Sequence, residues 1–220
     1  MHGKTVFLFD VDNTLLDNDA IADDLKRYLN REVGQDQEER YWAFFEQIRA
    51  ELGYADYLGA LQRYRLEYPH DLRILAAGEF LIDYPFADRL FPRALPVLEA
   101  AKRHGVAAIL SDGDVVFQPH KIRRSGLSAA VEGNVLVYVH KERELADVKR
   151  RYPADHYVLV DDKLRILTAV KGAWGKEVTT IFARQGHYAH DPEILASYPA
   201  PDRTIPHIAD LLAELEAVAA

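Results

Sequence analysis

The chain has 220 residues, of which 27 are Lys or Arg and 35 are Asp or Glu, so its formal net charge is 27 − 35 = −8. A hydrophobic content of 49% and a charged content of 28% are typical of a folded globular protein and exclude wholesale disorder. The lack of cysteine excludes disulfides, thiolate metal ligands and a cysteine nucleophile, and the acidic balance disfavours binding to nucleic acid or anionic membranes.

The N-terminal region shows no targeting segment. Its first apolar run, residues 6–9, is interrupted by Asp10, too early for the core of a signal peptide. No stretch of the chain approaches the length of a membrane span. We therefore expect a cytoplasmic protein.

The first predicted element is a buried strand over residues 6–10, and a long helical segment follows it. Residues 17–90 contain no convincing strand and are predicted to form four helices, which end near Gly34, near Gly53, before Pro69 and before Pro85. A helical block inserted after the first strand of an α/β sheet would lie over the carboxyl ends of the strands, where such folds bind ligands.

Short apolar runs and amphipathic stretches alternate through the rest of the chain. The runs predict strands over 106–110, 135–139, 157–160 and 178–182, and helices are expected over 92–105, 163–171 and 205–218. This alternation is typical of a Rossmann-like α/β fold, in which helices flank a parallel sheet. We expect residues 1–16 and 91–220 to form this core and residues 17–90 to form an inserted helical domain.

Polar side chains follow each of four predicted strands. Asp10-Val11-Asp12-Asn13-Thr14 follows the first strand, Ser111 the second, His140-Lys141 the third and Asp161-Asp162 the fourth. The carboxyl ends of parallel strands share one edge of the sheet, so these groups should converge there. Asn13 tolerates the left-handed backbone conformation that would turn Asp10 and Asp12 toward one site, and the Thr14 hydroxyl could orient a carboxylate.

This concentration of acids indicates a cation. Four carboxylates without a counter-charge would repel one another and raise their pKa values. Mg²⁺ prefers oxygen ligands and commonly combines a few carboxylates with water and a phosphate group. Each feature also has a structural explanation, since Ser111 or Lys141 alone could be a surface residue, and the Asp161-Asp162 pair could cap a helix.

With these motifs in this order, the chain resembles the haloacid dehalogenase-like hydrolase superfamily. Its four motifs correspond to Asp10–Thr14, Ser111, Lys141 and Asp161-Asp162, and residues 17–90 are similar to the family's C1-type helical cap. The chain departs from the common pattern in having Asn13 in place of Gly and Glu142 in place of Pro. Lys121 is the competitor for the third motif, but it falls in the predicted helix after Ser111, and we therefore prefer Lys141.

The resemblance implies a phosphatase mechanism. Asp10 would be the nucleophile, forming an aspartyl-phosphate, and Asp12 the general acid and base. Family members that cleave carbon–halogen bonds generally lack the second Asp, so its presence favours phosphate chemistry. Mg²⁺ would be held by Asp10, the Asp12 backbone carbonyl, Asp161 and Asp162. Ser111, which would hydrogen-bond a phosphoryl oxygen, and Lys141, which would neutralise charge, complete the expected catalytic set. The expected phosphate-binding set is Asp10, Asn13, Thr14, Ser111, Asp112 and Lys141.

The expected activity is therefore Mg²⁺-dependent hydrolysis of a small phosphorylated molecule, by a monomer or homodimer. Three alternatives remain open. A phosphotransferase or phosphomutase would use the same aspartyl-phosphate, a 2-haloacid dehalogenase would use the same nucleophile, and a non-catalytic phosphate-binding protein would retain only the scaffold. Neither nucleic acid nor a membrane is an expected partner.

Overall fold

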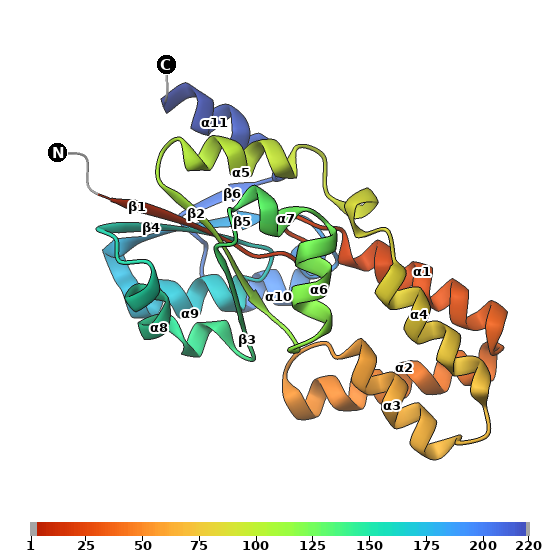
Figure 1. Ribbon diagram of the computed structural model, residues 1–220. Helices are drawn as coiled ribbons and strands as arrows, with labels where there is room; N and C mark the ends of the chain where they lie inside the picture. Colours follow the sequence, from red (N-terminus) through yellow and green to blue (C-terminus); the bar gives the residue numbers. More distant parts are fainter. Residues whose placement is uncertain (1–3, 219–220) are drawn as a thin grey trace.

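A six-stranded sheet forms the centre of the computed structural model, which describes residues 4–218. The strand order is β3-β2-β1-β4-β5-β6, and every neighbouring pair is parallel. The strands are β1 (Thr5–Phe9), β2 (Val106–Asp112), β3 (Val135–Tyr138), β4 (His156–Asp161), β5 (Val178–Ala183) and β6 (Arg203–Ile205). The predicted parallel α/β sheet is confirmed (Figure 1).

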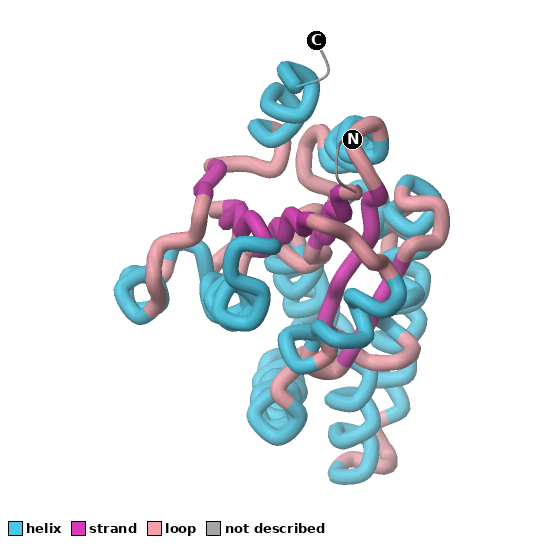
Figure 2. The backbone as a smooth tube through the Cα atoms, turned by 90° about the vertical axis from the view of Figure 1, so that its left-hand side faces the viewer, coloured by secondary structure: helices cyan, strands magenta, loops and turns pink. Residues whose placement is uncertain are grey.

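Helices cover both faces of the sheet because successive side chains of a strand point to opposite sides. In β1, Val6 and Leu8 pack in the apolar cluster that also contains residues of α8 (Leu145–Arg151) and α9 (Leu164–Trp174). Phe7 and Phe9 pack with residues of α5 (Ala94–Lys102) and α11 (Asp210–Val218). Figure 2 shows the strands as a twisted layer between these helices.

The segment between β1 and β2 is helical, as predicted. It contains α1 (Asn18–Glu32), α2 (Gln35–Leu52), α3 (Tyr57–Glu67) and α4 (Leu75–Asp83), with a 3₁₀ turn over Leu72–Ile74 before the last. These helices project beyond the sheet in Figure 1. Their two connections to the sheet run side by side, since the Asp17 N–H donates to the Arg89 carbonyl at 2.8 Å and Leu16 forms an antiparallel bridge with Leu90. Residues 17–90 as a separate domain remain a prediction.

Some elements differ from the sequence-based expectations. β6 was not predicted, because it has only three residues and two of them are exposed. The closing helix begins at Asp210 rather than near residue 205, since Arg203–Ile205 pair with β5 instead. α6 (Phe117–Arg124), α7 (Leu127–Ala130) and α10 (Pro192–Ser197) complete the α-helices of residues 4–218. None of the helices described there has the length and apolar composition needed to cross a membrane.

Candidate active site

The loop after β1 turns sharply at Asn13, whose φ of 60° lies in the left-handed region. Asparagine adopts this conformation more readily than most residues. The Asn13 side chain then organises the start of α1, because its Oδ1 accepts hydrogen bonds from the N–H groups of Asn18 at 3.0 Å and Asp19 at 3.1 Å. The side chain expected to bind phosphate is therefore engaged with α1. This turn separates the side chains of Asp10 and Asp12, which have different partners.

Lys141 joins two of the motif carboxylates. Its Nζ lies 2.5 Å from Asp10 Oδ1 and forms an ion pair with Asp161 Oδ2 at 2.7 Å. The Thr14 hydroxyl donates to the other oxygen of Asp10 at 3.3 Å. All four side chains are buried. Burial opposes the charge of Lys141, but the carboxylates of Asp10, Asp161 and the nearby Asp112 raise its pKa well above the ordinary value, so this ammonium stays charged.

Asp10, Asp161 and Asp162 form an acidic cluster, with one oxygen of each within 4.8 Å of the others. Burial, reinforced by the charge of Asp10, raises the pKa of Asp161 to about 6. Burial also raises the pKa of Asp162 well above its ordinary value, and Asp10 and Asp161 add to that effect. Three carboxylates therefore lie close together in a buried site.

Asp162 shows that the cluster fits a divalent cation. Both of its carboxylate oxygens are buried and have no hydrogen-bond partner among residues 4–218. A buried carboxylate without a partner is costly, and three carboxylates around one point are the hard oxygen ligands that Mg²⁺ prefers. Asp162 does not cap α9, which begins after Lys163 without a side-chain cap, so the capping alternative does not account for its carboxylate.

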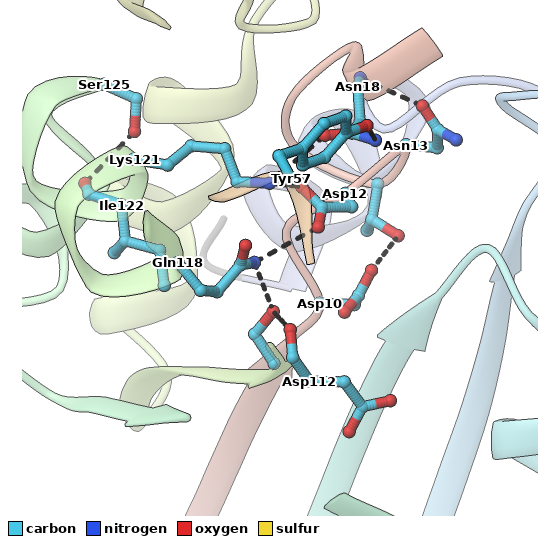
Figure 3. A network of polar contacts seen from close by, with 12 residues as sticks. Asp10, Asp12, Asn13, Asn18, Tyr57, Asp112, Gln118, Lys121, Ile122 and Ser125 are labelled. Atoms are coloured by element: carbon cyan, nitrogen blue, oxygen red, sulfur yellow. Dashed lines mark hydrogen bonds and ion pairs between the residues drawn. The ribbon is translucent and has the colours of Figure 1, made fainter. Parts of the chain in front are cut away.

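Asp12 lies in a second polar group (Figure 3). Its Oδ1 is 2.5 Å from Lys121 Nζ, and its Oδ2 accepts a hydrogen bond from Gln118 Nε2 at 3.2 Å. Gln118 also donates to Ser111 Oγ at 2.8 Å. Ser111, at the end of β2, is thus linked to Asp12 rather than to Asp10. The Asp12 carboxylate is not part of the acidic cluster, and the assignment of its backbone carbonyl to a metal remains a prediction.

Asp112 supports the loop that carries Lys141. Its Oδ1 accepts a hydrogen bond from the Lys141 backbone N–H at 2.7 Å. Burial raises the pKa of Asp112, while Lys141 opposes that shift. The contact ties the end of β2 to the 3₁₀ turn that follows β3, and so fixes the position from which Lys141 extends toward Asp10.

A cavity of about 840 Å³ lies over this edge of the sheet. Asp12, Gln118 and Lys121 line it from the core, and aromatic and charged residues of the helical segment line it from the other side, namely Trp42, Phe45, Glu46, Arg49, Tyr54 and Tyr57. Two contacts join lining residues of the helical segment to lining residues that follow β5. Arg49 Nη1 donates to the Tyr188 hydroxyl at 3.0 Å, and His187 Nδ1 lies 2.7 Å from Asp19 Oδ1. The cavity is therefore formed jointly by the sheet and the inserted helices.

The structure adds residues that sequence reasoning did not assign to the site. Gln118 was not considered, and Lys121 was weighed only as a rival to Lys141, yet both contact Asp12. Their spacing of three residues, which places both on one helix face, was the available signal. Lys163 also lies close to the acids. Burial opposes its charge, but Asp162 and Asp10 raise its pKa above the ordinary value.

Comparisons with known proteins identify similar sequences and structures. A family model described as haloacid dehalogenase-like hydrolase matches residues 4–173. The solved structure of a haloacid dehalogenase-like hydrolase from Burkholderia xenovorans LB400 is 59% identical in sequence, with a TM-score of 0.92 and coverage of 95% of this chain and 97% of that chain. No curated protein matches the chain.

More distant structures share the fold. A magnesium-bound hydrolase from Bacillus subtilis is 17% identical with a TM-score of 0.63, and covers 96% of this chain and 98% of its own. An L-2-haloacid dehalogenase from Xanthobacter autotrophicus is 17% identical with a TM-score of 0.64, and the match covers 97% of this chain and 98% of the dehalogenase. At these identities the likeness concerns architecture alone.

Proposed function

Because the chain belongs to the haloacid dehalogenase-like hydrolase family, we propose that it is a Mg²⁺-dependent phosphatase that hydrolyses a small phosphorylated molecule. The position of Asp12 carries the proposal. Its carboxylate lines the cavity and does not belong to the acidic cluster. An alkoxide leaving group needs a proton when its bond to phosphorus breaks. A halide ion leaves without one, so a dehalogenase would have no use for this acid.

In the first half-reaction, a carboxylate oxygen of Asp10 attacks phosphorus. The bond from phosphorus to the ester oxygen breaks, and Asp12 gives its proton to the departing alkoxide. In the second, Asp12 takes a proton from water, whose oxygen attacks the aspartyl-phosphate and releases inorganic phosphate and Asp10. Lys141, 2.5 Å from Asp10 Oδ1, reduces the repulsion between that carboxylate and the incoming anion. The Thr14 hydroxyl orients the second oxygen of Asp10.

Mg²⁺ would be held by the carboxylates of Asp10, Asp161 and Asp162; their close approach and the two unpartnered oxygens of Asp162 support this assignment. The resemblance adds the backbone carbonyl of Asp12. When bound, the ion would supply positive charge for the phosphoryl oxygens as negative charge develops on them. The magnesium-bound relative from Bacillus subtilis is consistent with this choice of metal.

The inserted helices would act as a lid that admits small substrates and excludes water. The hydrogen bond between Arg49 and Tyr188 joins the lid to the core and would form on closure. Interdomain movement is described for the Bacillus subtilis hydrolase, and we propose the same kind of movement here. A cavity of about 840 Å³ is suited to a metabolite rather than to a folded macromolecule.

Two variants and two substrate types test the proposal. Asp10→Asn should abolish turnover and prevent trapping of a phosphoenzyme. Asp12→Asn should slow hydrolysis of an alkyl phosphate by about 10²–10⁴-fold and affect an aryl phosphate much less, because a phenolate leaves without protonation. Near-normal turnover by Asp10→Asn, or equal losses on both substrates in Asp12→Asn, would contradict these roles. Release of chloride from 2-chloropropionate by the wild type would favour the dehalogenase alternative.

A further inference from the structure

α6 presents two buried polar side chains to the site that the proposed chemistry leaves without a role. Gln118 is 3% exposed and Lys121 is 1% exposed. Removing an ammonium group from water costs several kcal/mol unless good pairing offsets the loss. The buried ammonium of Lys121 therefore needs partners that offset this cost, and the identity of those partners indicates the role of the residue.

The partners of Lys121 converge on Asp12. Lys121 Nζ lies 2.5 Å from Asp12 Oδ1, and Gln118 Nε2 donates to Asp12 Oδ2 at 3.2 Å. Each oxygen of this carboxylate is thus held from the same face of α6. Because Gln118 also donates to Ser111 Oγ at 2.8 Å, its amide is itself fixed against the end of β2. The carboxylate is held at two points and has little freedom to rotate.

The inserted helices brace Lys121 from the opposite side (Figure 3). Lys121 Nζ donates to Asn18 Oδ1 at 3.1 Å, and Asn18 Nδ2 donates to the Tyr57 hydroxyl at 3.2 Å. Asn18 is the first residue of α1 and Tyr57 the first of α3. Because an ammonium group only donates, the oxygen of the Asn18 amide faces the lysine, and its nitrogen is left to donate to the Tyr57 hydroxyl. The ammonium is therefore held between the core and the inserted helices.

We propose that Lys121 is a positioning residue that, together with Gln118, aims the Asp12 carboxylate at the leaving-group oxygen. The proposal rests on the acid–base function proposed for Asp12 and extends it. The two buried lysines then have separate tasks, since Lys141 contacts Asp10 and Asp161 whereas Lys121 contacts Asp12. A displacement of a reacting group by about 1 Å can cost about 10²-fold in rate, so loss of this support should be visible in turnover.

A double-mutant cycle tests this mode of action. Lys121→Met should lower kcat on an alkyl phosphate by about 10²-fold, lower it much less on an aryl phosphate, and leave KM nearly unchanged. In an Asp12→Asn background, Lys121→Met should have almost no further effect, because the group that it positions is already disabled. Lys121→Arg should restore part of the rate, and Arg124→Gln, an exposed charge on the same helix, should match the wild type.

Equal losses from Lys121→Met with and without Asp12, or a rise in KM with unchanged kcat, would overturn the proposal, because Lys121 would then act on substrate or on the fold. A crystal structure of Lys121→Met provides a readout that does not depend on activity. Without the Lys121 contact, the Asp12 carboxylate should turn out of its wild-type orientation, and an unchanged orientation would refute the positioning role. If Lys121→Met does not fold, Lys121→Gln is tested by the same criteria. A wild type inactive on every phosphate ester would refute the proposed function, while the crystal structure would still decide the role of Lys121.

Discussion

Replacing Asp162 with Asn should stabilise the metal-free protein, although the residue lies among the proposed metal ligands. Asp162 is 1% exposed, and both of its carboxylate oxygens lack a hydrogen-bond partner among residues 4–218. Burial raises the pKa of this carboxyl well above its ordinary value; Lys163 opposes the shift, whereas the charges of Asp10 and Asp161 add to it. Asn keeps nearly the same shape and removes the charge, so the repulsion within the cluster falls.

The expected gain in stability follows from the burial of the Asp162 carboxylate without a hydrogen-bond partner. A buried group without a partner costs about 1–3 kcal/mol, and more when it is charged, so Asp162→Asn should raise the free energy of unfolding by at least about 1 kcal/mol. For a chain of this length that corresponds to about 2–4 °C in Tm for each kcal/mol. Because the pKa of Asp162 is higher in the folded state, the advantage of the variant should shrink as the pH falls and the wild-type carboxyl becomes protonated.

The assay is urea denaturation of both proteins, first with EDTA and then with excess Mg²⁺. At a free concentration of about 100 times its Kd, a ligand that binds only the folded state adds about 2.7 kcal/mol. The wild type should gain this stabilisation and Asp162→Asn should gain much less, so the order of stability should reverse. Asp88→Asn, which removes an exposed carboxylate, should change neither result.

A lower stability of Asp162→Asn in EDTA would refute the reasoning, because the wild-type carboxylate would then have a stabilising partner in solution. An equal gain from Mg²⁺ in both proteins would show instead that Asp162 is not a ligand. The two results are separable, since the first concerns the protein without metal and the second concerns the metal.

Other measurements address the rest of the site. Burial raises the pKa of Asp161 from 3.8 to about 6. A carboxyl whose pKa is higher in the folded state contributes to the free energy of unfolding while it is protonated. That contribution is complete below the ordinary pKa and is lost as the pH rises through about 6. The urea midpoint of the metal-free protein should therefore fall across this interval, and it should fall less in Asp161→Asn. Gly53 has a φ of +81°, and an added Cβ would lie 2.5 Å from the ring of His140, the residue before Lys141. Gly53→Ala should cost about 1–2 kcal/mol in backbone strain and reduce turnover, whereas Gly133→Ala, with a φ of +79° and no atom within 4 Å, should show a similar strain with normal turnover.

The sequence alone determined the parallel α/β fold and the convergence of polar groups at one edge of the sheet. Both follow from local patterns, since short apolar runs alternate with amphipathic stretches and parallel strands must end on the same side. Asp10 and Asp162 lie directly after a strand, Asp161 is the last residue of β4, and Lys141 follows the end of β3 after two residues, so their places in the chain bring them to this edge. The close approach of Asp10 to Asp161 and Asp162 also requires that β1 lies next to β4, as it does in this sheet.

Only the tertiary structure decided which charges pair. Lys121 lies in α6 after β2 and Lys141 in the turn after β3. The sequence does not reveal that Lys121 contacts Asp12 while Lys141 contacts Asp10 and Asp161. A long side chain can reach several acids, and its partner depends on how α6 packs against the sheet and the inserted helices. The strand order also depends on the tertiary structure, because strand pairing joins residues that are far apart in the chain. β6 could not be predicted, because a three-residue edge strand has too few side chains to form a recognisable pattern.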